Sequence, residues 1–151
     1  MAARLLEQHA LSSADMDGVS PLHVAAENNH AKLIILLLGE IDIDSRSRSG
    51  NTPLLLAAHA GASDAIRQLI ADGADLELRN SVGDTAVIAA IRAGDLKSSE
   101  LLLVAGANVN TRNDRFESAQ SLIKHLGDPQ WIELLEKADS GVFGLFGKLV
   151  K

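Results

Sequence analysis

The sequence predicts an all-α fold in which pairs of short helices stack side by side into an elongated solenoid. One phrase recurs along the chain: "SPLHVAAENNH" begins at Ser20, "TPLLLAAHAGA" at Thr52, "TAVIAAIRAGD" at Thr85 and an eroded copy, "SAQSLIKHLGD", at Ser118. The copies start 32, 33 and 33 residues apart, and such a period indicates units that bury their apolar faces against neighbouring units. Only four of the 151 residues are aromatic, so the core must consist of Leu, Ile, Val and Ala, which suit close helix packing.

The second copy shows why each unit reads as turn, helix, turn, helix and loop. Thr52 is an N-cap candidate, and Pro53 is tolerated in a first helical turn because its missing N–H has no partner there. Residues 54–61 are expected to form the first helix, which Gly61 ends. Apolar residues then recur at helical spacing in "SDAIRQLIADG", where Gly73 supplies a left-handed stop. An extended segment and a tight turn lead to the next unit.

The period and the phrases "GNTPLLLAA" and "GADLE" resemble the ankyrin repeat. The resemblance covers roughly residues 16–137 and implies about four stacked repeats, joined by hairpin-like loops and closed by capping ends. The domain from 1 to 139 would comprise a partial N-terminal cap at 1–15, repeats at about 16–47, 48–79 and 80–112, and a C-terminal capping repeat at 113–139. Residues 140–151 form a separate tail.

Departures from the family pattern fall on framework positions. Ala86 and Ala119 stand where the family prefers proline, and Phe116 replaces the turn glycine. Leu55 and Ile88 occupy the usual histidine slot. The scatter of these changes is typical of a natural sequence rather than of a consensus design.

Composition excludes several classes of protein. The chain carries a net charge of −6, and residues 1–45 hold seven acids against two bases, so the N-terminal third repels nucleic acid and no lysine-rich stripe elsewhere attracts it. The absence of cysteine excludes disulfides, thiolate zinc sites and cysteine nucleophiles, and it fits a reducing compartment. The N-terminus lacks a secretory pattern, and the longest apolar run is too short to cross a bilayer. We therefore expect a cytoplasmic protein.

Two histidine arrangements could suggest chemistry. Ser20 and His23 could be read as a nucleophile and a base, but no orienting acid recurs with them, and in ankyrin-like turns such a pair is a structural hydrogen bond. His23 and His30 lie seven residues apart with no nearby ligand cluster, which argues against a metal site. The sequence thus predicts no catalytic, cofactor or metal site.

Arg46, Arg79 and Arg112 lie one period apart and form a regular basic column at the loops. Such a column could bind a phosphate or an acidic partner. A basic residue is common at this slot in the family, and acids neighbour each arginine, so we interpret the column as solvated framework.

The resemblance implies that a protein partner binds the concave face, which the loop tips and the exposed sides of the first helices form. The predicted partner-binding residues are Met16, Asp17, Val19, Glu27, Asn28, Arg48, Ser49, Asn51, His59, Ser81, Val82, Asp84, Arg92, Asp114, Arg115 and Glu117.

These slots differ strongly between repeats, whereas the framework does not. A partner that selects the variable residues would produce this contrast, although exposed positions that drift freely would do so too. The acidic first repeat suggests a partner with a basic patch. We expect a monomeric, non-enzymatic interaction module that needs no cofactor.

The tail "GVFGLFGKLVK" at 141–151 forms an amphipathic stripe at helical spacing, with Phe143, Phe146 and Leu149 as its main contact residues. Its glycines and its shortness make an isolated helix marginal in water. The stripe could pack on the last repeat, enter a partner groove, touch a membrane surface or mediate self-association. A peripheral membrane or assembly factor anchored by this tail is the alternative function.

Overall fold

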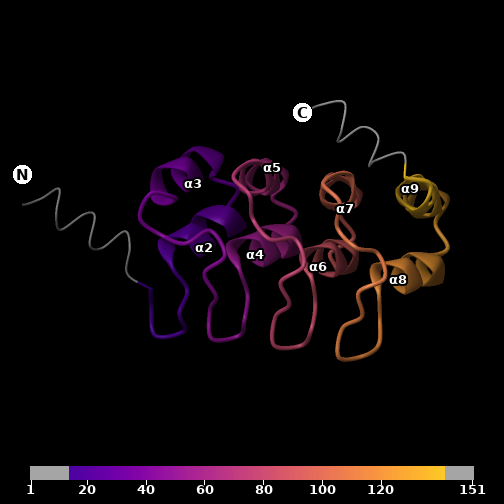
Figure 1. Cartoon of the computed structure of the whole chain (residues 1–151), viewed down its shortest axis with the longest axis horizontal. Helices are drawn as coiled ribbons and strands as arrows, with labels where there is room; N and C mark the ends of the chain where they lie inside the picture. The colour runs from indigo at the N-terminus through magenta and orange to yellow at the C-terminus, as the bar shows by residue number, and fades with distance from the viewer. Residues whose placement is uncertain (1–13, 142–151) are drawn as a thin grey trace, which may run out of the picture.

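A computed structural model describes residues 14–141 of the chain. Within this range the chain forms helices only, apart from one isolated antiparallel bridge between Arg112 and Ser118. The helices pair along the chain, as the repeat pattern predicts (Figure 1). Their bounds are α2 Pro21–Glu27, α3 Ala31–Leu37, α4 Pro53–Ala60, α5 Ser63–Ala71, α6 Ala86–Arg92, α7 Leu96–Val104, α8 Ala119–Leu126 and α9 Pro129–Asp139.

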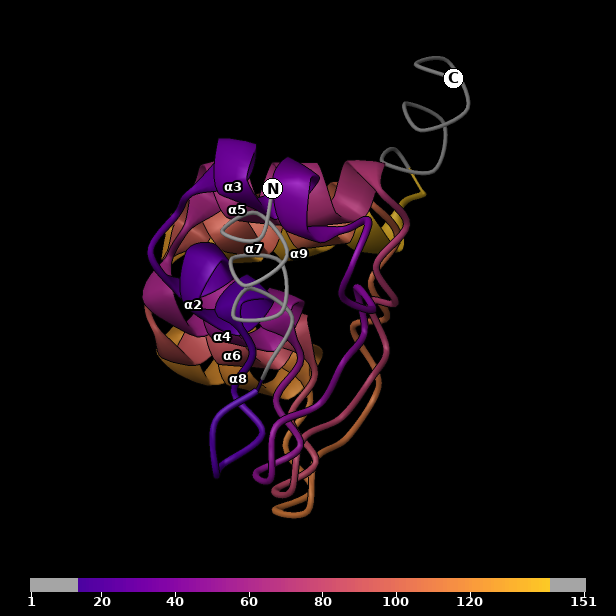
Figure 2. The same ribbon diagram turned by 90° about the vertical axis from the view of Figure 1, so that its left-hand side faces the viewer.

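The helices lie in two layers. Helices α2, α4, α6 and α8 form an inner row, and α3, α5, α7 and α9 form an outer row beside it (Figure 1). Each inner helix contacts the next inner helix, and each outer helix contacts the next outer helix. Four long loops project past the inner row at one edge of the stack (Figure 2). The predicted all-α solenoid of stacked helix pairs is confirmed.

Local sequence signals determine where the helices begin and end. The side-chain oxygen of Thr52 accepts a hydrogen bond from the Leu55 N–H at 3.2 Å, and Pro53 opens α4. Gly61 ends α4 in the left-handed region with φ of 67°, where a side chain is disfavoured. The N-cap and helix stop predicted for the second copy are therefore both confirmed.

The core runs continuously between the two layers and is built from small and branched aliphatic side chains. Ala57 and Ala58 of α4 are fully buried, which allows α4 to lie close to both α2 and α6. Leu54, Ile66 and Leu69 fill the space between the inner and outer rows. Burial of this kind, shared between neighbouring units, is the main stabilising term of a repeat array.

Phe116 marks the least regular loop of the stack. It adopts φ of 62° at the slot where the other loops have Gly18, Gly50 and Gly83, a conformation that is unfavourable for a residue with a bulky side chain. The residue is 78% exposed. The turn geometry is therefore kept in the fourth repeat without the glycine that normally supplies it.

The predicted ends of the chain fall largely outside the described residues. Only residues 14 and 15 of the predicted partial cap and residues 140 and 141 of the predicted tail are included, so Phe143, Phe146 and Leu149 lie outside the described range. Among the helices of residues 14–141, none is both long and apolar enough to cross a membrane.

Candidate partner-binding face

The loops owe their shape to one polar side chain at the start of each turn. In the third loop, Asn80 Oδ1 accepts hydrogen bonds from the N–H groups of Val82 at 3.1 Å and Asp84 at 3.0 Å. Asn113 makes the same pair of bonds in the fourth loop. Such bonds hold a turn in one conformation. Each loop is therefore fixed from within.

Neighbouring loops are also joined to one another through the backbone. The Arg48 N–H donates to the Asp17 carbonyl at 2.7 Å, the Ser81 N–H to Ser49 at 2.9 Å and the Asp114 N–H to Val82 at 3.1 Å. The four loops thus form one hydrogen-bonded strip along the stack. A strip of this kind presents its side chains without further ordering.

The signal for the turn-forming residues was present in the sequence. Asp15, Ser47, Asn80 and Asn113 follow the same 32- and 33-residue spacing as the phrase itself, and each accepts a hydrogen bond from an N–H group of its own loop. Analysis of the sequence missed this column because Asp, Ser and Asn look dissimilar. They share a short polar side chain that can accept from the backbone two to four residues ahead.

Most of the predicted partner-binding residues are exposed on the loops and the inner helices. Half-buried positions are Val19, Asn51 and Glu117, and Asp84 is buried at 6% exposure. The exposed ones are Met16, Asp17, Glu27, Asn28, Arg48, Ser49, His59, Ser81, Val82, Arg92, Asp114 and Arg115.

Two hollows bring predicted residues together. The first two loops enclose a hollow of about 430 Å³ lined by Asp17, Val19, Arg48 and Ser49, with Ser47. A second hollow of about 240 Å³ between α4 and α6 is lined in part by four other predicted residues, Asn51, His59, Asp84 and Arg92.

Arg92 is engaged by the protein itself. Its guanidinium pairs with Asp84 at 3.5 Å and with Glu117 of the next repeat, and Asn113 donates to both Asp84, at 2.8 Å, and Glu117, at 3.1 Å. The Asn113 hydrogen bond and then the Arg92 guanidinium lower the pKa of Glu117 below its usual value. This cluster links the third and fourth repeats, so Arg92 is a structural residue as well as a surface residue.

His23 is structural, as the sequence predicted. It is fully buried, its Nδ1 accepts from the Ser20 N–H at 3.1 Å, and its Nε2 lies 2.9 Å from the Asn51 carbonyl, to which the Nε2–H tautomer donates. Ser20 Oγ lies 2.8 Å from Nδ1 and caps α2. Burial lowers the pKa of His23, against the opposing effect of the Asn51 carbonyl. The hydroxyl and both ring nitrogens therefore bond within the protein, where they fasten the start of α2 and join it to the second loop.

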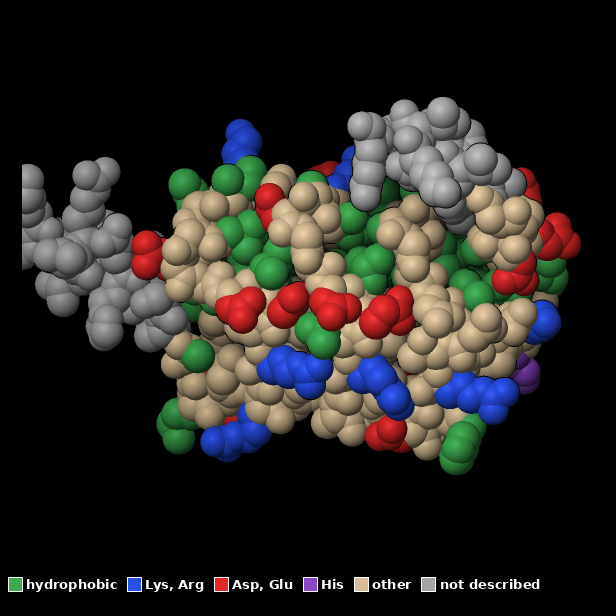
Figure 3. All heavy atoms as spheres, in the orientation of Figure 1, with side chains coloured by type: hydrophobic (Ala, Val, Ile, Leu, Met, Phe, Trp, Pro, Cys, Tyr) green, Lys and Arg blue, Asp and Glu red, His purple; other side chains and the backbone are tan. Residues whose placement is uncertain are grey.

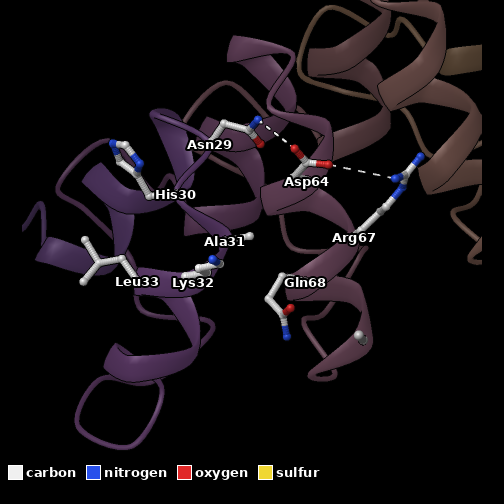
Figure 4. Close-up of a pocket in the computed structure, with 9 residues that line it drawn as sticks. Asn29, His30, Ala31, Lys32, Leu33, Asp64, Arg67 and Gln68 are labelled. Atoms are coloured by element: carbon white, nitrogen blue, oxygen red, sulfur yellow. Dashed lines mark hydrogen bonds and ion pairs between the residues drawn. The ribbon is translucent and has the colours of Figure 1, made fainter.

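A larger hollow lies between the outer helices and not on the proposed face. It encloses about 850 Å³ between α3 and α5 (Figure 4). Asn29 bridges its two sides, since its Oδ1 accepts from the Ala65 N–H at 2.9 Å and its amide donates to Asp64 at 3.3 Å. Asp64 in turn pairs with Arg67 at 3.9 Å. Asn29 and Asp64 thus join the first repeat to the second at this hollow.

The face with the connecting segments carries a row of acidic side chains above basic ones (Figure 3). Several acids of these segments have structural roles: Asp44 accepts from the Asp75 N–H at 3.0 Å, and Glu77 accepts from the Asn108 N–H at 2.8 Å. From the predicted arginine column, Arg79 donates to the Gly83 carbonyl at 3.1 Å and pairs with Asp114 at 3.4 Å. Arg79 thus fits the framework interpretation. No cluster of potential metal ligands occurs in the searched part, residues 14–141.

Comparison with known proteins identifies the repeats. The family model described as ankyrin repeats (3 copies) matches residues 22–113, more than half of the chain. Neurogenic locus notch homolog protein 4 of Homo sapiens is 38% identical over 73 residues, which cover 46% of this chain and 4% of that protein.

Two further relatives match over similar stretches. E3 ubiquitin-protein ligase KEG of Arabidopsis thaliana is 36% identical over 66 residues, or 42% of this chain and 4% of the ligase. Ankyrin repeat domain-containing protein 29 of Homo sapiens is 42% identical over 52 residues, or 33% of this chain and 17% of that protein. The chain thus spans less than a fifth of the length of each of these relatives. Ankyrin repeats are generally protein–protein interaction modules and are typically non-enzymatic. With its family match and its stacked helix pairs, this chain belongs to the ankyrin-repeat family.

Proposed function

We propose that the protein is a non-enzymatic module, of the adaptor, inhibitor or immunity-factor type, that binds a protein partner through the face formed by the loop tips and the inner helices. The observation that carries this proposal is the combination of a fixed backbone with varied side chains. The four loops form one hydrogen-bonded strip, while the exposed residues that they present differ from repeat to repeat.

The mechanism is preorganisation. A partner that binds a mobile surface loses affinity because loops and side chains must be ordered on binding. In this protein Asn80 and Asn113 already hold the third and fourth loops, and backbone hydrogen bonds join each loop to the next. More of the contact energy therefore appears as affinity.

Arg48 and Arg115 are the residues through which the proposal is best tested. Both are exposed on the loops. Arg92, by contrast, is paired with Asp84 and Glu117, and its replacement by Glu would place three carboxylates together and disturb the fold as well as the surface. Substitutions at Arg48 and Arg115 therefore test the surface, whereas a substitution at Arg92 would also disturb the contact between repeats.

The experiment compares two charge-matched double variants with the intact chain in affinity capture from source lysate. Arg48→Glu with Arg115→Glu alters the proposed face, and Lys32→Glu with Lys97→Glu makes the same charge change at exposed positions of the outer helices. We expect the first pair to lose the captured partner and the second to retain it, with unchanged helicity in both. Retention by the first pair, or equal loss from both, would show that the face is misassigned.

The finer assignments rest on the sequence alone. A cytoplasmic location, a monomeric state and a role for the tail in membrane or assembly contacts stay predictions. Deletion of residues 140–151 tests the role of the tail. Loss of liposome or oligomer association with a retained fold would favour the anchor, whereas aggregation would favour a capping role.

A further inference from the structure

The hollow between α4 and α6 is lined by one unusually small residue. Ala89 stands in the slot that Val24, Leu56 and Leu122 occupy in the other three repeats. Beside Ala89 the protein encloses about 240 Å³ on the inner-helix side, with Leu55 and Leu56 as the other apolar lining residues. Liquid water takes about 30 Å³ per molecule, so the hollow has the volume of about eight waters.

This volume suits one inserted side chain. Sites for drug-sized ligands begin at about 300 Å³, which is more than the hollow offers. Hot spots of protein interfaces are commonly single aromatic side chains seated in pockets near the centre of the contact. The hollow lies between the second and third of the four described repeats, at the middle of the proposed face.

The charges around the hollow favour a neutral occupant. Arg92 is the lining cation, and its guanidinium is already paired with Asp84 and Glu117. Of the two carboxylates only Asp84 lines the hollow, and it balances the charge of Arg92, so the lining carries no net charge that could offset an incoming anion or cation. Neither charged group therefore finds a free counter-ion at this position.

The polar lining offers both flat surfaces and hydrogen-bonding groups. A guanidinium plane stacks well on aromatic rings, and two carboxylates hold that of Arg92 in place. The imidazole of His59 is exposed at the same hollow. Asn51 and Asn80 bring amide groups that bond to each other at 3.1 Å. A ring with a terminal hydroxyl matches this mixture of apolar, planar and amide surfaces.

We propose that the hollow beside Ala89 receives one neutral aromatic side chain, of the tyrosine type, from the protein partner. The inference rests on the proposed function and names the chemistry of its central contact. Tyrosine combines a rigid apolar ring with a polar tip and loses little conformational entropy when it is immobilised.

The test uses the full chain and p-cresol, the side-chain analogue of tyrosine, followed by amide NMR. We expect saturable shifts at Leu56, Asn80 and Ala89 at millimolar concentrations of p-cresol. Acetate and guanidinium, used as charged probes, should shift these amides less and without saturation. Absence of saturation by p-cresol, or equal responses to the charged probes, would overturn the proposal.

Two matched variants locate the binding. Ala89→Leu fills the hollow with a side chain that the same slot already holds in Leu56 and Leu122, and it should weaken p-cresol binding by about tenfold or more because the ring then clashes. Ala93→Leu makes the same change at an exposed position at the end of α6 and should leave binding unchanged. Ala89→Val replaces the first variant if circular dichroism shows that Leu disturbs the fold. Undiminished binding by a folded Ala89 variant would contradict the assignment.

The p-cresol experiment needs no partner, so it separates this inference from the proposed function. If p-cresol fails to bind while Arg48→Glu with Arg115→Glu still abolishes partner capture, the face is correct and the hollow is filled by water only. If p-cresol binds and the loop variants retain the partner, the proposed face fails independently.

Discussion

The two ends of the described stack place the same residue in the same slot with opposite exposure. Leu36 of α3 and Leu134 of α9 occupy equivalent positions in the first and last repeats, yet Leu36 is 74% exposed and Leu134 is 5% exposed. Helix α7 precedes α9 in the outer row and contacts it, whereas no described helix precedes α3. Burial in a stack therefore depends on the neighbour and not on the residue.

The first repeat also exposes Val24, Leu33 and Ile35. In the second, third and last repeats the Ile35 slot holds Arg67, Glu100 and Glu133, and Glu133 pairs with Lys137 at 2.8 Å. The second, third and last repeats thus carry a charged residue in this slot, while the first carries an exposed apolar one. The two ends of the described stack are therefore built differently.

The largest expected effect on the free energy of unfolding lies at Leu134, the buried member of the Leu36 and Leu134 pair. Leu134→Ala removes a buried side chain between α9 and its neighbours and should lower the free energy of unfolding by about 2–5 kcal/mol. Urea unfolding followed by circular dichroism measures the loss. A change below about 1 kcal/mol would mean that α9 does not pack as described.

A smaller loss of unfolding free energy is expected at the turn-forming position, which is Asn113 in the last repeat and Asp15 in the first. Asn113 is buried and bonds to Asp84, Glu117 and two N–H groups, so Asn113→Ala should destabilise by about 1–3 kcal/mol. Asp15 is exposed, and among residues 14–141 its side chain bonds to the N–H groups of its own loop. Asp15→Ala should therefore cost less, because water replaces the lost acceptor. The reverse order in urea unfolding would contradict the comparison.

Between about pH 7 and 5, a pH-dependent loss of stability is expected at the first repeat. His23 and Ser121 occupy the same slot and complete the same capping box with Ser20 and Ser118, but only His23 titrates. Burial lowers the pKa of His23, so the unfolded chain takes up the proton first as the pH falls below about 6.5. This contribution to stability is complete above that pH and is lost as the pH falls through the depressed pKa.

Amide hydrogen exchange as a function of pH measures the effect. Between about pH 7 and 5, amides of α2 should lose protection earlier than amides of α8. His23→Gln provides the control, because its side chain does not titrate in this range and should remove the difference in pH dependence. Equal loss at both ends would assign the pH dependence to other groups.

The smallest effect on the free energy of unfolding is expected at Leu36, the exposed member of the Leu36 and Leu134 pair. Leu36→Ala should change the free energy of unfolding by no more than about 0.5 kcal/mol, as exposed substitutions usually do. The same urea experiment compares it directly with Leu134→Ala. A loss as large as that at Leu134 would show that the flank of the first repeat is covered in the folded protein.

The sequence alone was sufficient to predict the structural features that recur every 32 or 33 residues. Thr52, Pro53 and Gly61 define one helix by local chemistry, and their recurrence predicts the stack. The pairing of Arg92 with Asp84 and Glu117 could not be predicted, because it joins side chains of two repeats whose distance depends on how the repeats dock. Comparison of the repeats in the sequence shows that Ala89 is small for its slot, but the hollow beside it depends on how α4 and α6 dock and could not be predicted.

The most direct test of the central claim, that the loops are fixed before a partner binds, is amide hydrogen exchange in the isolated protein. Val82 and Asp84 donate to Asn80, and Arg115 and Glu117 donate to Asn113. We predict that these four amides exchange far more slowly than amides of an unstructured peptide, and that Asn80→Ala and Asn113→Ala each release the pair in their own loop. Exchange of all four at unstructured rates in the unaltered protein would contradict a preorganised face.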